Sequence, residues 1–160
     1  MRDFTMVSPR IWMSPKFWAL PSNEERFVYL YVLTGQHQNG AGAYHLPVGY
    51  AAADLRSTPV AVTAALGELN QAGLIEFDPA TSEVLIVGWF DLCKPQNAKH
   101  YEGVKRRIAQ LLSARLRDIA EADAARAWAE CEAGRAARAL QAAPSSSQRS
   151  MSSVLLRNVK

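Results

Sequence analysis

The residues whose chemistry is simplest to interpret are a group of positive charges in the second half of the chain. Lys105, Arg106 and Arg107 follow one another, and the only acid in the surrounding segment is Glu102. The cationic side chains of this segment are Lys94, Lys99, Lys105, Arg106, Arg107, Arg115 and Arg117. Neutralisation of phosphate by lysine and arginine supplies essentially all non-specific affinity for nucleic acid. We therefore interpret the segment as a phosphate contact, with a solvated helix face as the alternative.

Two side chains inside this segment could lie against a nucleobase. His100 and Tyr101 both carry rings of the kind that stack on bases. For Tyr101, packing against the protein itself is the simpler interpretation, and we favour it.

The net charge of +3 hides a division between the two halves of the chain. Residues 1–92 hold five Lys/Arg against nine Asp/Glu, a net charge of −4. Residues 93–160 hold thirteen Lys/Arg against six Asp/Glu, a net charge of +7. Affinity for a polyanion is therefore expected in the second half and not in the first.

The chain contains no recognisable catalytic or metal-binding pattern. Cys93 and Cys131 stand apart, and neither they nor His37 and His45 have partners at metal-ligand spacing. Motifs for a nucleophile elbow, a P-loop or a zinc protease do not occur. We expect a protein that is not an enzyme and has no cofactor. Reduced thiols, the lack of a secretory signal and the lack of a long apolar run predict a cytoplasmic location without membrane contact.

The elements that position the basic segment begin with a helix at Ser22, where Ser22 and Glu25 form a capping box. The apolar residues 27–33 predict that this helix is covered on several sides. A short strand at 43–46, a helix after Pro47 and a turn at 56–57 follow. The next helix is expected to bury a stripe formed by Val62, Ala65, Leu66 and Leu69. Strands at 74–78 and 83–87 around a turn at 79–82 complete the pattern.

Helix, short strand, helix, turn, helix and hairpin, in this order, predict a winged helix-turn-helix. The expected fold class is mainly α, an α+β winged helix-turn-helix with a two-stranded wing and a C-terminal helical extension. The predicted divisions are an extended arm with one short helical turn (1–21), the winged helix (22–92), a basic helical extension (93–143) and a disordered tail (144–160).

Within the extension, the sequence leaves open whether residues 98–143 form one helix or two. Gly134 and the acidic residues 118–123 mark the places where a break is expected. The apolar stripe predicted to face the core consists of Val104, Ile108, Leu111, Leu112 and Ile119, extended less regularly by Trp128.

Three stretches together carry a family resemblance. They are SPRIW at 8–12 with LYVLT at 30–34, GAYHLP at 42–47, and LGELNQAGLI at 66–75. Residues 8–90 resemble the N-terminal winged-helix domain of bacteriophage replication-initiation, or replisome-organiser, proteins. The resemblance implies that the winged helix binds double-stranded origin DNA. It also implies that the C-terminal part engages the replicative helicase or its loader. The third stretch is shared by most winged-helix families and is specific for the fold rather than the function.

The sequence departs from this family's DNA-reading pattern on the third helix of the winged helix. The exposed face of that helix has no Lys or Arg; it is expected to present Thr58, Ala61, Thr63, Ala64, Gly67, Glu68, Asn70 and Gln71. The wing tip at 78–83 is acidic, whereas tips that touch phosphate are basic. Such a domain cannot hold DNA tightly without help.

Three explanations are open: phosphate contacts from the basic segment, dimerisation that pairs two weak half-sites, or a winged helix that binds protein instead. In the first, Arg56, Thr58, Thr63 and Asn70 add weak readout to contacts from Lys94, Lys99, Lys105, Arg106 and Arg107. The corresponding functions are a phage-type replication initiator, a transcription regulator that forms a homodimer through residues 98–143, and an interaction or inhibitor factor that does not bind DNA. In the tail, Val154, Leu155, Leu156 and Val159 form an apolar cluster that we expect to contact a protein partner.

Overall fold

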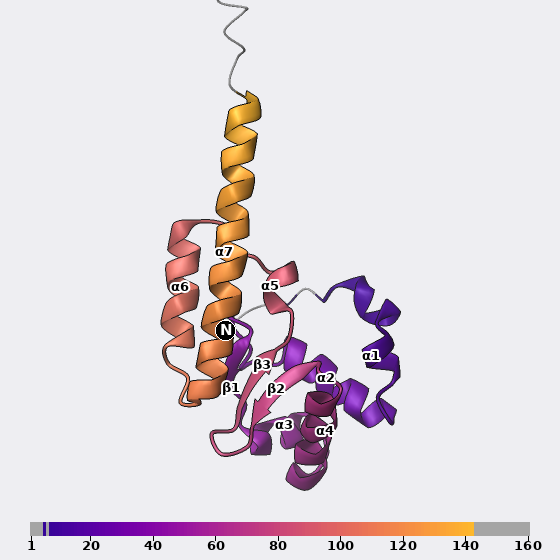
Figure 1. The fold of residues 1–160 in the computed structure, drawn as a ribbon. Coiled ribbons are helices and arrows are strands. Elements are labelled where there is room, and N and C mark those ends of the chain that lie inside the picture. The colour runs from indigo at the N-terminus through magenta and orange to yellow at the C-terminus, as the bar shows by residue number, and fades with distance from the viewer. Residues whose placement is uncertain (1–4, 6, 143–160) are drawn as a thin grey trace, which may run out of the picture.

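The computed structural model describes Thr5 and residues 7–142. The described chain is mainly helical, with a small three-stranded antiparallel sheet (Figure 1). The first half contains η1 (Pro9–Met13), α1 (Pro15–Trp18), α2 (Asn23–Thr34), β1 (Ala43–His45), α3 (Val48–Asp54) and α4 (Pro59–Gln71). The second half contains β2 (Ile75–Asp78), β3 (Glu83–Ile86), α5 (Trp89–Leu92), α6 (Ala98–Ile108) and α7 (Ala114–Ala142). The predicted tail, 144–160, lies outside the described residues.

The helix α2 begins as the sequence predicts. The Ser22 amide donates to the Glu25 carboxylate (2.8 Å), and the Ser22 hydroxyl accepts from the Glu24 amide (3.0 Å). The predicted coverage on several sides holds except at Phe27, which is 57% exposed; Val28, Tyr29 and Val32 are buried. Tyr31 and Leu33 are partly buried against the same core, the Tyr29 ring lies 6.1 Å from that of Phe17 on α1, and the Tyr31 hydroxyl donates to Asp54 on α3 (2.7 Å).

The helix α4 buries the stripe that its spacing predicts. Val62, Leu66 and Leu69 have no exposed surface, and Ala65 has almost none. Thr58 caps the helix by accepting from the Ala61 amide (3.2 Å), and Pro59 occupies its first turn. The order of α2, β1, α3, α4 and the β2–β3 hairpin agrees with the predicted order and is compatible with a winged helix.

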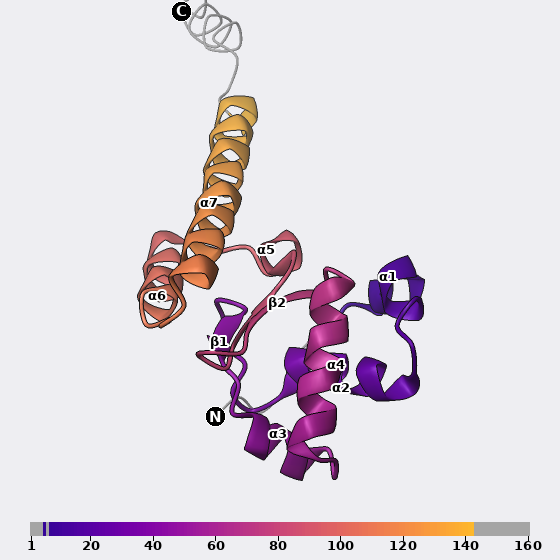
Figure 2. The ribbon, with the colours of Figure 1, turned by 60° about the horizontal axis from the view of Figure 1, so that its bottom comes forward.

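The sheet separates two layers of helices, because both of its faces are covered. The central strand is β3, with β1 and β2 antiparallel on either side. Val84 and Ile86 pack with α2, α3 and α4, whereas Leu85 points to the opposite face and packs with α6 and α7. Figures 1 and 2 show α6 and α7 on one side of the sheet and α4 on the other.

The extension forms two helices, but the break is at neither place the sequence indicates. Helix α7 runs without interruption through residues 118–123 and Gly134. The chain turns instead at 109–113, where the Ser113 hydroxyl accepts from the Leu116 amide (3.4 Å). The turn leaves Leu112 75% exposed and buries Leu116 completely, so the predicted stripe is wrong at Leu112 and omits Leu116.

The segment before α2 is not an extended arm with a single turn. It forms two short helices, η1 and α1, each capped by a serine. Phe17 is its buried anchor, whereas Trp12 and Trp18 remain 57% and 52% exposed. The Arg26 guanidinium fixes the end of α1 by donating to the carbonyl oxygens of Trp18 (3.0 Å) and Leu20 (2.7 Å).

Candidate nucleic-acid interface

The acidic hairpin that the sequence places at a wing tip faces inward, toward the start of α7. Glu83 is 2% exposed, and its two carboxylate oxygens accept from the amides of Leu112 (2.9 Å) and Ser113 (2.7 Å). These amides are the free donors before the first turn of α7, where negative charge is favourable. Glu83 is therefore a buried cap for α7, which corrects the expectation of an exposed acidic tip.

The other two acids of the hairpin are also engaged by this end of α7. Glu76 forms an ion pair with Arg115, and Arg115 also donates to the Phe77 carbonyl (3.0 Å). A hydrogen bond from Ser113 holds the pKa of Asp78 below its usual value. Arg115, counted in the sequence with the free cations, is consequently a contact between α7 and β2.

The four candidate contacts on and beside α4 differ in how free they are. Thr58 caps α4, and the Asn70 side-chain oxygen accepts from the Phe77 amide (2.9 Å) at the start of the hairpin. Thr63 and Arg56 are exposed, and Arg56 lies at a positive φ of 53° in the turn between α3 and α4. The structure thus gives Thr58 and Asn70 structural roles and leaves Thr63 and Arg56 available.

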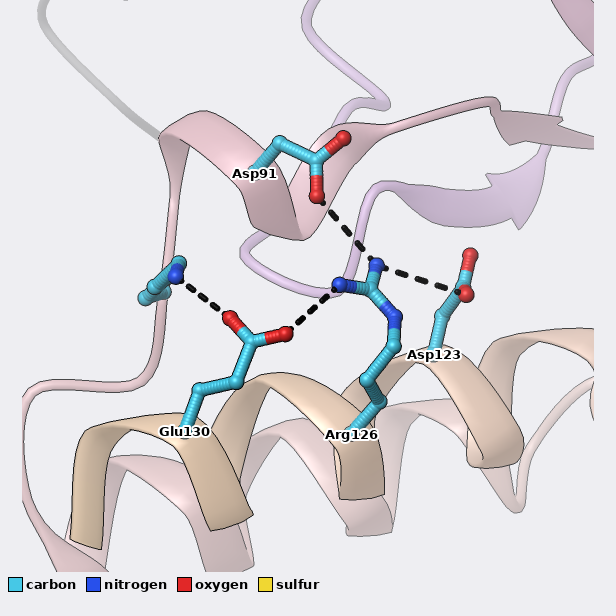
Figure 3. A network of polar contacts seen from close by, with 5 residues as sticks. Asp91, Asp123, Arg126 and Glu130 are labelled. Atoms are coloured by element: carbon cyan, nitrogen blue, oxygen red, sulfur yellow. Dashed lines mark hydrogen bonds and ion pairs between the residues drawn. The ribbon is translucent and has the colours of Figure 1, made fainter. Parts of the chain in front are cut away.

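Lys94 is held in a network of ions between α7 and the residues around α5 (Figure 3). Its ammonium group lies 2.6 Å from the Glu130 carboxylate, which also contacts Arg126 (3.1 Å). Arg126 reaches Asp91 on α5 (3.2 Å) and Asp123 on its own helix (3.6 Å). Lys94 and Arg126 lower the pKa of Glu130 because both stabilise its charged form. Lys94 therefore ties the chain after α5 to α7.

The three consecutive cations of α6 do not form one cluster. Lys105 and Arg107 are two residues apart, about 200° around the helix, and so project to different sides. Lys105 pairs with Glu102 (2.7 Å) and lies over the Tyr101 ring, 5.2 Å from its centroid. Lys99, Arg106 and Arg107 are exposed and make no ion pair within the part of the chain that the structure describes.

Tyr101 packs against the protein, as expected. Its ring stacks on Trp128 of α7 with the ring centroids 5.0 Å apart and the planes 6° from parallel. The Arg135 guanidinium also lies over the Trp128 ring, 5.1 Å from its centroid. Because Lys105 covers the free side of Tyr101, both rings are occupied, and the stack joins α6 to α7.

A recess of about 570 Å³ lies between α6 and the loop from Gly35 to Gly42. One wall is a face of α6, and the opposite wall is formed by the loop; the lining residues are Gln36, Gln38, Asn39, Gly40, Lys99, His100, Gly103, Val104 and Arg107. None of these residues is acidic. The His100 Nδ1 accepts from the Gln96 amide (3.3 Å), so in the neutral ring Nε2 carries the hydrogen and is a donor.

The sequence predicted the cations of this recess but not its second wall. Residues 36–42 are polar and contain two glycines, a composition that predicts a connecting loop and nothing more. These residues face α6, which lies some sixty residues later in the chain, only because the extension folds back over β1. A run of amide side chains beside a short strand gives no signal of that kind.

The exposed face of α4 and the basic face of α6 do not form one continuous surface. The sheet lies between them, as both ribbon views show. Phosphate contacts by α6 and readout by Arg56, Thr58 and Thr63 would therefore come from different faces of the molecule. Of the nine candidate residues, the structure brings only Lys99, Arg106 and Arg107 together as exposed, unpaired cations.

Thr5 and residues 7–142 contain no group of three or more His, Cys, Asp or Glu side chains that could hold a metal ion. Among the described helices, none combines the length and the apolar character needed to cross a bilayer. Comparison of the chain with models of protein families, with curated proteins and with solved structures found no match.

Proposed function

We propose that the chain is a winged-helix DNA-binding protein that holds DNA through α6 and not through the third helix of its winged helix. One observation carries this proposal: Lys99, Arg106 and Arg107 are exposed and have no carboxylate partner among the described residues. Unpaired cations on one helix are available to replace the counterions of phosphate. By contrast, α4 has no Lys or Arg, and the hairpin acids contact α7.

The family resemblance supports a part in replication initiation. The stretches that carry the resemblance lie mainly on η1, α2, β1 and α4; they are residues 8–12, 30–34, 42–47 and 66–75. On this proposal the layer of α2, α3 and α4 is the winged helix, and the second layer supplies the phosphate contacts. Engagement of a replicative helicase or its loader by the C-terminal part remains a prediction.

The first test neutralises the three unpaired cations. The combined variant Lys99→Gln, Arg106→Gln and Arg107→Gln is expected to weaken binding of duplex DNA about equally for all sequences. It should also flatten the log–log salt dependence by up to about 2.7, since each phosphate contact contributes roughly 0.9. The measurement is fluorescence anisotropy of a labelled 20-base-pair duplex across a salt series, with the full chain.

The matched control is the double variant Lys94→Gln and Lys105→Gln. It also removes positive charges, but both side chains are already paired with acids. A smaller change in salt slope per charge removed is expected. If the control and the triple variant reduce the salt slope equally per charge removed, DNA binding depends on net charge alone. The unpaired cations of α6 would then not be a specific DNA contact.

A second candidate function, protein binding by the winged helix, is favoured by a different surface. Tyr50 on α3 is 64% exposed and Val60 on α4 is 81% exposed, beside a helix that carries no positive charge. Helices with exposed apolar side chains and no cation suit a protein partner better than a phosphate backbone. If the wild-type chain binds no DNA at low salt, this candidate replaces the first.

A further inference from the structure

The recess between α6 and the Gly35–Gly42 loop is larger than a phosphate contact requires. A side chain that touches the backbone of a duplex needs only an exposed position, as Arg106 has. The recess has a volume of about 570 Å³, within the range of roughly 300–1,000 Å³ typical of small-molecule sites. Its size therefore suits a ligand with a body as well as a charge.

Positive charges stand at both ends of the helical wall of this recess. Lys99 and Arg107 are eight residues apart on α6, which separates their backbones by about 12 Å along the helix axis. Gly103 lies midway between them, and a Cβ there would meet no atom within 4 Å. A ligand lying across Gly103 would thus have a cation on each side, as a nucleotide in a strand has a phosphate on each side.

Apart from Val104 and the glycines, the remaining side chains of the recess are polar donors and acceptors. Gln36 is exposed, and side-chain amides hydrogen-bond the edges of nucleobases. The His100 ring lies next to Lys99, and histidine stacks on unpaired bases. The loop wall is fixed, because the Gly40 carbonyl accepts from the Trp89 indole (3.0 Å). A preformed recess of this composition complements a nucleobase between two phosphates.

We propose that this recess binds one unpaired nucleotide of a DNA strand, with its flanking phosphates at Lys99 and Arg107. A base within a duplex is stacked on both faces and paired along one edge, so it cannot enter a recess. An unpaired base can. The inference rests on the proposed function, since α6 is the surface that holds DNA, and adds that single-stranded DNA is preferred. Inorganic phosphate and a free nucleotide share part of this chemistry, and the experiments below compare both of them with the single strand.

The decisive variant fills the recess without changing charge. Gly103→Leu places a side chain in the open space at the centre of the recess, and leucine favours the helix more than glycine does. We expect at least about a fivefold loss of affinity for a 12-nucleotide single strand, the lower end of what loss of one base contact produces. Affinity for a blunt duplex, and its salt slope, should stay unchanged. Gly134→Leu on α7 is the matched control, because its Cβ also meets nothing within 4 Å.

A second variant and a competition assay test the recess even if Gly103→Leu fails to fold. Gln36→Ala removes an exposed side chain and is expected to weaken the single strand but not the duplex. Thymidine monophosphate should displace the single strand at a lower concentration than inorganic phosphate does. Equal potency of the two competitors would mean that the recess holds only a phosphate, and the inference would be overturned.

The outcomes distinguish this inference from the proposed function. If the triple charge variant loses DNA but Gly103→Leu and Gln36→Ala bind single strands normally, α6 holds DNA and the recess takes no nucleotide. If Gly103→Leu weakens single strand and duplex equally, the recess is only part of a general phosphate surface, which also overturns the inference. If the wild-type chain binds neither form, both proposals fail.

Discussion

Glu83 shows how one residue of the hairpin determines where the second layer begins. Its carboxylate is buried, and a buried charge is costly unless hydrogen bonds compensate for its lost hydration. The amides of Leu112 and Ser113 provide that compensation. They lie at the N-terminal end of α7, where the helix dipole also favours a negative charge. The residue therefore joins the sheet to α7 by a polar contact within an otherwise apolar interface.

Glu83→Gln is expected to destabilise the chain by roughly 1–3 kcal/mol. The substituted amide group can accept from one of the two backbone donors, but its NH₂ faces the other, which is left unsatisfied in the interior. Thermal unfolding followed by circular dichroism measures the effect. Glu76→Gln is the control, because Glu76 forms a partly exposed ion pair with Arg115 that contributes at most about 1 kcal/mol. Equal losses for the two variants would mean that the Glu83 contacts are not maintained in solution.

At the scale of elements, α4 has a buried face and an exposed face that should tolerate substitution to different degrees. Leu66→Ala is expected to cost roughly 2–5 kcal/mol, because Leu66 is completely buried between α2 and the sheet. Thr63→Ala, on the exposed face, should change the melting temperature little. The comparison by thermal denaturation tests the orientation of α4; a larger effect at Thr63 would mean that the helix is rotated from the orientation described.

The sequence predicts the elements that depend on local patterns. The capping box at Ser22, the buried stripe of α4 and the hairpin all follow from spacings within a dozen residues. The break between α6 and α7 does not, because it depends on the contacts of Leu112 and Ser113 with Glu83, about thirty residues earlier. For the same reason the sequence predicts only one wall of the candidate site. It indicates the cations of α6 but not the Gly35–Gly42 loop opposite them.

At the scale of the whole molecule, the two helical layers share a single sheet. Leu85 of β3 and Phe90 of α5 are almost completely buried in the core that includes α6 and α7, although both belong to the first ninety residues. Removing the extension would expose this apolar face and leave the Glu83 carboxylate without its two amide donors. Point substitutions in the full chain are therefore a better test of DNA contacts than a truncation at residue 92.

If the layers depend on each other in this way, they should unfold together. Leu116 has no exposed surface and packs in the second layer, so Leu116→Ala is expected to cost roughly 2–5 kcal/mol. For a chain of this length, that loss lowers the melting temperature by about 4–20 °C. The exposed Leu112, four residues earlier, provides the control Leu112→Ala, which should leave the melting temperature nearly unchanged.

The decisive observation is whether the first layer responds to a cavity in the second. In a Trp128→Phe background, fluorescence comes from the three tryptophans of η1, α1 and α5, whereas circular dichroism reports every helix. Coincident transitions, both shifted by Leu116→Ala, are expected because the sheet transmits the loss of one layer to the other. A fluorescence transition that keeps its midpoint while the helical signal falls earlier would show that α6 and α7 unfold on their own. In that case the face of α6 proposed to bind phosphate would belong to an independent unit. The recess between α6 and the Gly35–Gly42 loop would then be lost before the main transition.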